Sequence, residues 1–452
     1  MARGRARAVR RRAGGHPAKV IVSGFAAVIA VGTVLLMLPL SASGPGGAPV
    51  TTARFTSTSG TCVTGLGVVD TATYWSPFGQ AVIMGLTQVG GLGILTSASL
   101  LLLVVSKRLG LRRMLIAQAE TNALQLGEVR TVVRGVVTLS AAVEGLTAVA
   151  LALRLWLGHG RSLGEALWQG GFLAVSAFNN LGYALYSDNL VGFADDPLIL
   201  APVALAVIAG GLGVPVWLEL RRRARTPRRW SLHTKLTLVT SAILLVGGSA
   251  LITALEWGND RTLGTLSPPL RVLNGAFLSV VSRSGGFNTF DIGGLEPESL
   301  FSVDVLMFIG GGSGSVAGGI KVTTFALLAL VVWAELRGEP DVSAFGRSVP
   351  HAAVRQAFAV MALSGALVGA AVLGLTATND LEFSGIVFEA LSAFGTAGLS
   401  TGITPLLDAA GRGILIALMF IGRVGPLALG AALVLRGRPR LYDFPEERPL
   451  IG

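Results

Sequence analysis

The 452-residue sequence has few charged residues and almost no cysteine. Charged residues make up 13% of the chain and hydrophobic residues 52%, whereas soluble domains carry roughly 25% charged residues. A soluble protein of this composition would expose apolar patches and aggregate. Cys62 is the only cysteine, which excludes an intrachain disulfide and a cysteine-rich metal site. The composition therefore predicts a membrane protein.

The sequence also lacks the residue clusters that chemistry in an active site needs. Its four histidines lie far apart and have no metal-ligand spacing (His16, His159, His233, His351). No cluster of acidic or basic catalytic residues accompanies them, and the sequence has no dinucleotide-binding fingerprint after a strand. Neither an enzyme nor a covalently bound cofactor is therefore expected. A membrane enzyme or a non-transporting scaffold is an alternative that no motif supports.

The net charge of +11 is concentrated in short segments. Of the 36 basic residues, 27 fall in five clusters, at 1–19, 107–134, 221–235, 335–355 and 436–452. They recur at every second crossing of an apolar sequence, which is typical of cytoplasmic loops and not of a nucleic-acid surface. Both termini are therefore predicted to be cytoplasmic. The first apolar segment resembles a signal peptide, with Ser41 to Ser43 as a cleavage site, but it is long enough to span and is interpreted as an uncleaved helix.

Eight apolar segments are long enough to cross a bilayer, which needs about 20 residues per helix. They lie at 20–40, 77–105, 130–157, 197–220, 233–256, 301–334, 352–376 and 409–435. The expected fold is all-helical, with eight spanning helices, four short pore helices and a central pore. The expected units are a basic N-terminus 1–19, repeats 20–106, 107–222, 223–337 and 338–436, and a cytoplasmic tail 437–452.

The four predicted external segments repeat in their letters. SGTCVTGL, SAFNNLGY and SAFGTAGL share a serine six residues before a glycine, and SRSGGFNTF keeps only the glycine. The aligned glycines are Gly65, Gly182, Gly286 and Gly398, at spacings of 117, 104 and 112. LMFIG ends at both Gly310 and Gly422, again 112 apart. Two motifs in one register predict four parallel repeats around one axis.

Four external segments, each with a glycine at the same position, are typical of an ion selectivity filter. Non-helical backbone in a membrane must line a cavity or lie within protein, and carbonyl oxygens from four strands can replace the hydration shell of a cation. The alternative is that each glycine closes a tight external turn.

These pore-loop motifs resemble those of the Trk/Ktr/HKT potassium transporters, most closely the membrane subunit of bacterial Ktr systems. The resemblance implies potassium uptake across a bacterial plasma membrane by a homodimer with one pore per subunit. It also implies a separate cytoplasmic nucleotide-binding ring as partner, and leaves Na⁺ as a candidate activator. In the plant branch, serine at the first filter glycine accompanies sodium transport, and here that position is Gly65. The third segment departs mildly, with Ser284-Gly285 where relatives often have Thr-Ala.

The resemblance assigns the filter and its ligands. The predicted filter residues are Thr64, Gly65, Leu181, Gly182, Gly285, Gly286, Ala397 and Gly398. The backbone groups expected to bind K⁺ are those of Thr64, Asn180, Gly285 and Ala397. The external carboxylates Asp70, Asp188, Asp291 and Asp380 could concentrate cations at the mouth, or could simply be solvated.

GGGSGSVAGGIK (310–321) resembles the family's intramembrane gating loop. Its predicted gating residues are Gly310, Gly311, Gly312, Ser313, Gly314, Ser315, Gly318, Gly319 and Lys321. Such weak helix formers should break a helix at mid-membrane; the alternative is a small-residue face for close helix packing. It is not a phosphate-binding loop, because Ile320 and Lys321 replace the required Lys-Ser/Thr.

Arg423 lies within the last apolar segment, where a charge usually faces a cavity or a partner. It is predicted to form an electrostatic barrier below the filter and to close the pore together with the loop. The alternative is an arginine that snorkels or pairs with Asp304 or Glu389. Gln88 and Glu144 are predicted to be helix–helix hydrogen-bond partners. A sodium-coupled secondary transporter, which would need inverted repeats, is the alternative function.

Overall fold

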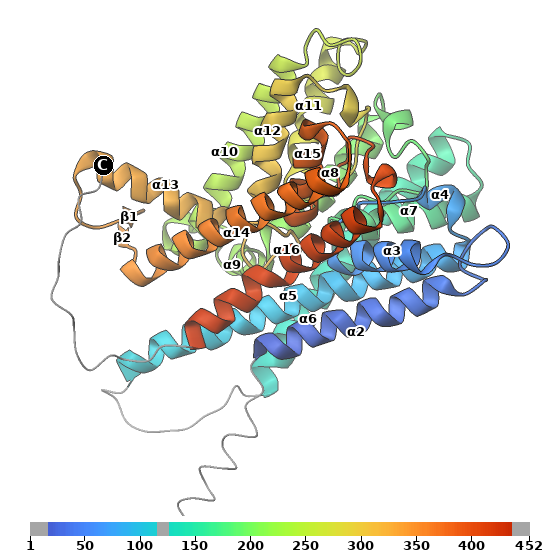
Figure 1. Cartoon of the computed structure of the whole chain (residues 1–452). Coiled ribbons are helices and arrows are strands. Elements are labelled where there is room, and N and C mark those ends of the chain that lie inside the picture. Colours follow the sequence, from blue (N-terminus) through green and yellow to red (C-terminus); the bar gives the residue numbers. More distant parts are fainter. Residues whose placement is uncertain (1–16, 115–125, 436–452) are drawn as a thin grey trace, which may run out of the picture.

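The computed structural model describes residues 17–114 and 126–435, and within these ranges the chain is almost entirely helical (Figure 1). The basic N-terminus to residue 16, residues 115–125 of the second basic cluster and the tail from 436 lie outside the described residues. A two-residue hairpin, β1 (Ser343–Ala344) paired with β2 (Arg347–Ser348), is a small departure from the all-helical expectation. It joins two helices at the end of the molecule on the left of Figure 1.

Five described helices are long and apolar enough to cross a membrane. They belong to α2 (Pro17–Met37), α5 (Pro77–Met114), α6 (Leu126–Gly158), α10 (Leu232–Leu255) and α14 (His351–Thr378). A further long helix, α16 (Ala409–Leu435), ends the described chain. All six coincide with apolar segments that the sequence predicts as spans.

The two remaining predicted spans are interrupted. Segment 197–220 divides into α8 (Pro197–Leu212) and α9 (Val214–Arg223), which meet at 96°. Gly213 makes this corner with φ +92°, and Pro215 follows it, so the helix cannot continue straight. Segment 301–334 divides into α12 (Pro297–Phe308) and α13 (Val322–Arg337), with non-helical backbone between them. The segment predicted as one spanning helix over 197–220 is therefore two helices with a sharp corner between them.

Four shorter helices precede the four glycine motifs. They are α3 (Val50–Cys62), α7 (Leu163–Phe178), α11 (Pro268–Ser282) and α15 (Phe383–Gly395). Each packs against the long helix that precedes it in sequence. Local signals explain where two of them begin: a capping box of Ser162 and Glu165 starts α7, and Pro268 occupies the first turn of α11.

The other short elements lie in the connections. They are α4 (Thr71–Tyr74) and the 3₁₀ turns η1 (Val191–Phe193), η2 (Pro227–Arg229), η3 (Ile292–Gly294) and η4 (Thr404–Leu406).

The core joins helices that are distant in sequence. One apolar cluster combines α6, α7, α8, α10, α11 and α12 with Phe388, Ala397 and Leu399 from the last quarter of the chain. A second combines α14, α15 and α16 with Phe55, Cys62 and Leu66 from the first quarter. Helix α16 also packs against α2 and α3 (Figure 1). The end of the chain therefore closes against its beginning, and the helix arrangement surrounds the four glycine motifs.

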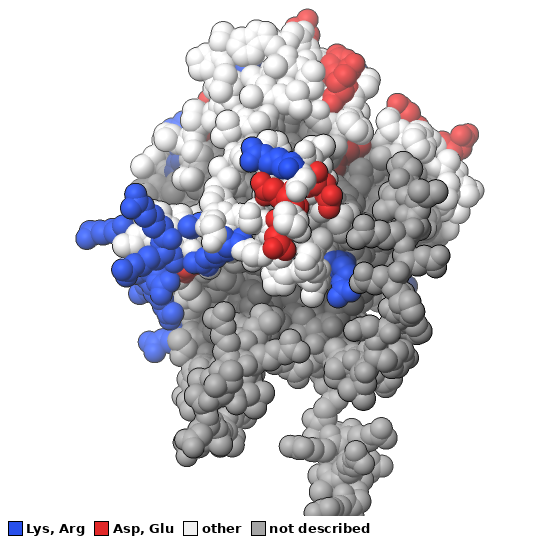
Figure 2. All heavy atoms as spheres, turned by 90° about the vertical axis from the view of Figure 1, so that its left-hand side faces the viewer, with Lys and Arg blue, Asp and Glu red and all other residues white. Residues whose placement is uncertain are grey.

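Basic side chains gather at one end of the molecule (Figure 2). The arginines of segment 221–229 are all exposed; three of them form the last turn of the corner helix α9, and the others follow it. Exposed acidic residues lie in the last turn of α13 (Glu335) and on the connection from α13 to β1 (Glu339 and Asp341). This end carries two of the predicted cytoplasmic clusters, 221–235 and 335–355.

Candidate functional site

The four aligned glycines meet in the interior of the molecule. A Cβ atom on Gly65 would overlap the carbonyl oxygen of Leu181 and lie 3.3 Å from the Cα of Gly398. A Cβ on Gly286 would lie 2.9 Å from the carbonyl oxygen of Ala397 and 3.1 Å from the Cα of Gly182. Segments more than 100 residues apart in sequence therefore bring their backbones into contact at one place.

The backbone repeats the same unusual conformation at these positions. Gly65, Gly182, Gly286 and Gly398 have φ values of +96°, +92°, +65° and +88°. Two residues before each glycine, Val63, Asn180, Ser284 and Thr396 also have positive φ, at 53°, 61°, 140° and 47°. Non-glycine residues rarely adopt this conformation, and it concentrates at functional sites. The fourfold repeat seen in the letters is thus also a repeat of positive φ, from which the third segment departs in detail because Ser284 lies far from the other three values and Gly285 also has a positive φ of +152°.

Two of the shared serines, Ser59 and Ser392, accept hydrogen bonds from the backbone of their own glycine segments. The Gly65 N–H donates to Ser59 Oγ at 3.0 Å, and the Gly398 N–H donates to Ser392 Oγ at 3.1 Å. In the second segment, Ser176 Oγ instead donates to the carbonyl oxygen of Tyr183 at 2.7 Å. In the first and fourth segments the serine hydroxyl therefore satisfies the N–H of the aligned glycine, and in the second segment it holds the residue after the glycine.

The third segment has no such serine and is held differently. The Gly285 N–H donates to the carbonyl oxygen of Ala397 at 3.3 Å, and Ser284 Oγ donates to that of Thr396 at 3.1 Å. Val280 stands where the other segments have serine. The third segment is therefore held by hydrogen bonds to the backbone of the fourth segment. Both bonds are made by Ser284 and Gly285, where the sequence departs from the family pattern.

In the second segment the geometry aligns Leu181, rather than Asn180, with the residues before the other three glycines. The carbonyl oxygens that approach the neighbouring glycines belong to Thr64, Leu181, Gly285 and Ala397. Each is the residue directly before its glycine. Asn180, predicted as the second-segment ligand, lies one residue earlier, so Leu181 supplies the equivalent carbonyl.

All nine predicted gating residues lie on the non-helical stretch between α12 and α13. Its backbone bonds to the corner of α8 and α9: the Gly312 N–H donates to Gly211 O at 2.8 Å, and the Val214 N–H donates to Gly314 O at 3.1 Å. The Gly310 N–H closes the base of the loop on Ile320 O at 2.9 Å. The alternative of an intact helix with a small-residue face is wrong, because the helix ends at Phe308.

The loop lies directly against the fourth glycine segment. A Cβ on Gly318 would overlap the side chain of Thr396, and a Cβ on Gly319 would lie 3.3 Å from the Cα of Gly395. Thr396 is the positive-φ residue of that segment. Glycine at 318 and 319 is thus required for the loop to approach the segment this closely.

Arg423 on α16 is buried and reaches the loop. Its side chain is 3% exposed, and its Nη1 donates to the carbonyl oxygen of Val316. Among the described residues its Nε and Nη2 atoms have no hydrogen-bond partner. Arg423 forms no ion pair in the part of the chain that the structure describes, so the alternative pairing with Asp304 or Glu389 is wrong. The Glu389 carboxylate accepts from Ser400 and Thr404 instead.

Lys321 bonds within the same loop. Its Nζ donates to the carbonyl oxygen of Ala317. Its side chain therefore fastens the end of the loop to the middle of it.

Gln88 and Glu144 are confirmed as hydrogen-bond partners between helices. Gln88 on α5 donates to Glu144 on α6 at 3.0 Å, and Ser140 donates to the same carboxylate at 2.6 Å. The sequence interpretation missed the fourth member, Asn179, which donates to Gln88 Oε1 at 2.8 Å and to Glu144 Oε1 at 3.2 Å. Asn179 precedes the positive-φ Asn180, so this network ties the second glycine segment to α5 and α6.

Arg283 is a second buried arginine that the sequence interpretation assigned no role. It is the C-cap residue of α11, directly before Ser284, and is 7% exposed. Its Nη1 donates to the carbonyl oxygen of Ser241 at 3.5 Å. A charge directly after the uncharged stretch 272–282 of α11 was the signal that could have identified it.

Asp70 forms the external support of the first segment. It caps α4 through the Ala72 N–H at 2.9 Å and accepts from Thr73 Oγ1 at 2.8 Å and from Ser187 Oγ at 2.6 Å. Ser187 follows the second glycine segment, so the carboxylate links two units. Partial burial raises the pKa of Asp70, but these hydrogen bonds outweigh it and hold the pKa below its usual value.

Asp70 is therefore expected to make stability fall in acid. Because its folded pKa is below its unfolded value, its contribution is present above the unfolded pKa, about 3.9, and is lost as pH falls through the folded pKa. The melting temperature of wild type should exceed that of Asp70→Asn at pH 7, and the two should converge as the pH falls through the folded pKa of Asp70. Asp380→Asn, at an exposed external carboxylate, is the control. A constant difference at all pH values would contradict the prediction.

Comparison with known proteins gives consistent results. Residues 12–435 match the family model TrkH, described as a cation transport protein. The chain is 40% identical to the Ktr system potassium uptake protein B of Bacillus subtilis (strain 168), over 91% of each chain. It is 37% identical to the Ktr system potassium uptake protein B of Vibrio alginolyticus, over 97% of this chain and 95% of that one.

The fold is also similar to a solved structure. The crystal structure of the potassium transporter TrkH from Vibrio parahaemolyticus superposes with a TM-score of 0.72, covering 93% of this chain and 84% of that chain, at 17% identity. That match supports the fold alone, while the family model and the relatives span nearly the whole sequence. The chain therefore belongs to the TrkH family of cation transport proteins.

Proposed function

We propose that this chain is the ion-translocating subunit of a potassium uptake system in a bacterial plasma membrane. The meeting of the four aligned glycine segments supports the proposal, because backbone carbonyls gathered at one place can replace the hydration shell of a cation. The names of the relatives from Bacillus subtilis and Vibrio alginolyticus support potassium as the ion.

The proposed architecture has eight spans and four pore helices. Each repeat consists of a long helix, a short helix with its glycine segment, and a second long helix, within the boundaries expected from the sequence. The clusters at 221–235 and 335–355 mark the cytoplasmic side, on which both termini lie. In this arrangement α8–α9 and α12–α13 are broken spans, and their breaks meet below the filter.

The proposed filter selects K⁺ with the carbonyls of Thr64, Leu181, Gly285 and Ala397. Flux is driven by the membrane potential: a charge crossing 100 mV gains about 2.3 kcal/mol, which sustains roughly a fiftyfold gradient because each 1.4 kcal/mol is a factor of ten. No chemical step is needed.

The proposed gate is the loop 310–321 together with Arg423. The loop contacts the fourth glycine segment on one side and the α8–α9 corner on another. Arg423 holds the middle of the loop through Val316 O, and its positive charge opposes cations below the filter. Opening requires the loop to leave these contacts.

The proposed assembly is a homodimer with one pore in each subunit. A cytoplasmic nucleotide-binding ring, a separate chain, would control the gate. The word "system" in the names of the Ktr relatives agrees with a multi-subunit transporter. The exposed arginines at 221–229 are the proposed docking surface for the ring.

Rubidium uptake into proteoliposomes tests the function. Purified protein should take up Rb⁺ under an inside-negative potential without a sodium gradient, and excess external K⁺ should compete while an equal excess of Na⁺ should not. Protein-free liposomes are the control. Uptake that requires a sodium gradient would contradict the pore and support a sodium-coupled transporter.

A further inference from the structure

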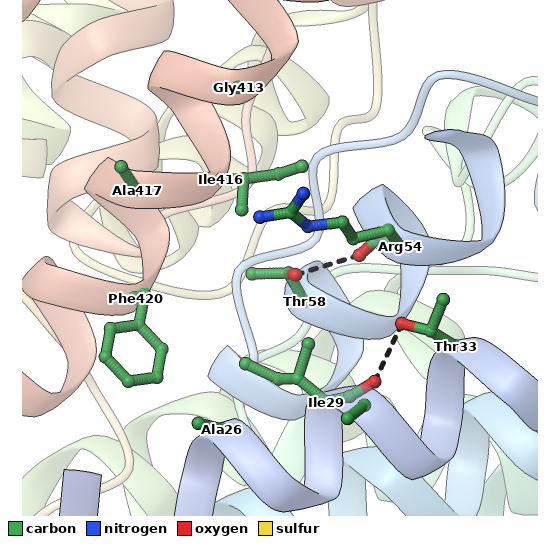
Figure 3. A pocket seen from close by; sticks show the side chains of 10 residues that line it. Ala26, Ile29, Thr33, Arg54, Thr58, Gly413, Ile416, Ala417 and Phe420 are labelled. Atoms are coloured by element: carbon green, nitrogen blue, oxygen red, sulfur yellow. Dashed lines mark hydrogen bonds between the residues drawn. The ribbon is translucent and has the colours of Figure 1, made fainter. Parts of the chain in front are cut away.

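An apolar groove runs along the seam where the last helix closes against the first (Figure 3). Its volume is about 560 Å³, within the roughly 300–1,000 Å³ typical of pockets that hold small ligands. Helix α2 contributes Ala26, Ile29, Ala30 and Thr33. Helix α16 contributes Gly413, Ile416, Ala417 and Phe420, and α3 contributes Arg54 and Thr58.

The groove lies along the outer halves of α2 and α16 in the proposed orientation. In the proposed orientation, Met37 and Ala409 are the outer ends of α2 and α16. Ala26 and Phe420 each lie eleven residues further in, because 37 − 26 and 420 − 409 both equal 11. At 1.5 Å per residue this is about 16 Å, close to half of the roughly 30 Å hydrocarbon core. The outermost lining residues of these helices, Thr33 and Gly413, lie four residues or about 6 Å from the same ends. In the proposed orientation the groove therefore covers about 6 to 16 Å of depth, within the outer leaflet.

Arg54 supplies the only charge among the residues that line the groove. It lies one turn after the start of α3, near the outer end of the groove, and its guanidinium points into the groove towards Ile416 (Figure 3). The side chain is exposed, and among residues 17–114 and 126–435 no hydrogen bond or ion pair of its guanidinium is found. A cation on an apolar, membrane-facing surface needs an anionic partner.

We propose that this groove binds an anionic phospholipid of the outer leaflet, with the phosphate on Arg54 and one acyl chain along α2 and α16. A guanidinium pairs well with a phosphate, and no carboxylate lines the groove to compensate the amine of a zwitterionic lipid. The small side chains Ala26, Ala30, Gly413 and Ala417 leave room for the chain. The lipid fills the seam between the first and last units, a role beyond the proposed ion transport.

Native mass spectrometry of the purified protein tests the site without measuring ion flux. The probes are dioleoyl phosphatidylglycerol and dioleoyl phosphatidylcholine. Wild type should retain one phosphatidylglycerol per chain more tightly than phosphatidylcholine. Arg54→Gln should weaken phosphatidylglycerol about fivefold, as expected for one basic residue at a membrane surface, and should remove the preference, whereas Arg54→Lys should keep it. Ala417→Trp should displace both lipids. Arg161→Gln, at an exposed residue of the α6–α7 connection, is the matched control.

Two results would overturn the proposal. Equal retention of phosphatidylglycerol by wild type, Arg54→Gln and Ala417→Trp would show that the lipid binds elsewhere. A loss of dimer mass in the two variants with unchanged lipid retention would show that a second copy of the chain fills the groove. Because dimer and lipid masses are read in the same spectra, a variant that fails to fold is recognised by its loss of both, and Arg54→Lys then decides.

Discussion

A Gly398→Ser variant is expected to lose at least tenfold in rubidium uptake when sodium competes. Gly398 has φ +88°, and a Cβ there would overlap the carbonyl oxygen of Thr64 and lie 3.1 Å from the Cα of Gly286. Strain of this kind costs roughly 1–3 kcal/mol, and each 1.4 kcal/mol is a factor of ten in an equilibrium. The displaced carbonyl of Thr64 would also fit K⁺ less well. Uptake of ⁸⁶Rb⁺ with and without excess Na⁺ measures both effects.

Gly402→Ser is the matched control for this variant. Gly402 follows Gly398 by four residues and has a similar φ of +91°, but a Cβ there would meet nothing within 4 Å. It therefore reproduces the backbone strain without the clash between filter strands. Equal losses in the two variants would contradict the filter assignment, since strain alone would then explain the effect.

An Arg423→Ala variant is expected to raise basal uptake about tenfold or more. The substitution removes the hydrogen bond from Arg423 to Val316 O, which holds the loop in place. A hydrogen bond from a charged group is worth roughly 1.5–3 kcal/mol, which shifts the closed–open equilibrium by about ten- to a hundredfold. It also removes a positive charge from the proposed path. The initial rate of ⁸⁶Rb⁺ uptake without any partner subunit is the measurement.

Arg412→Ala provides the control on the same helix. Arg412 donates to the carbonyl oxygen of Pro405 near the outer end of α16 and does not reach the loop. Its uptake rate should equal that of wild type. If Arg423→Ala folds normally and its rate is unchanged, the loop is held by its contacts with Gly211 and Thr396 alone, and Arg423 is not part of the gate.

The repeat and the class of fold could be predicted from the sequence because both depend on local pattern. The length of each apolar segment predicts a long helix, and a position that requires positive φ is recognised in the sequence as a recurring glycine. The alignment of Gly65, Gly182, Gly286 and Gly398 therefore predicted a shared geometry, which the φ values show. The break in segment 301–334 was also predictable, because glycine and serine are weak helix formers.

Other features depended on contacts between distant residues. The corner at Gly213 had a local signal in Gly213 and Pro215, but its angle follows from the bond between the Val214 N–H and Gly314 O, a hundred residues away. Likewise, no pattern shows that Asn179 joins Gln88 and Glu144, or that Leu181 and not Asn180 stands level with Thr64.

The sequence by itself determined that the chain is a helical membrane protein with a fourfold motif, because hydrophobic length, charge bias and glycine register act residue by residue. Only the tertiary structure decided what each motif touches. In the structure the loop packs against Thr396, and Arg423 donates a hydrogen bond to a backbone carbonyl and not to a carboxylate. Arg54 lines a groove between α2 and α16. The physical reason is that hydrogen bonds and packing between segments depend on how the four units close around one another, which periodicity along the chain does not record.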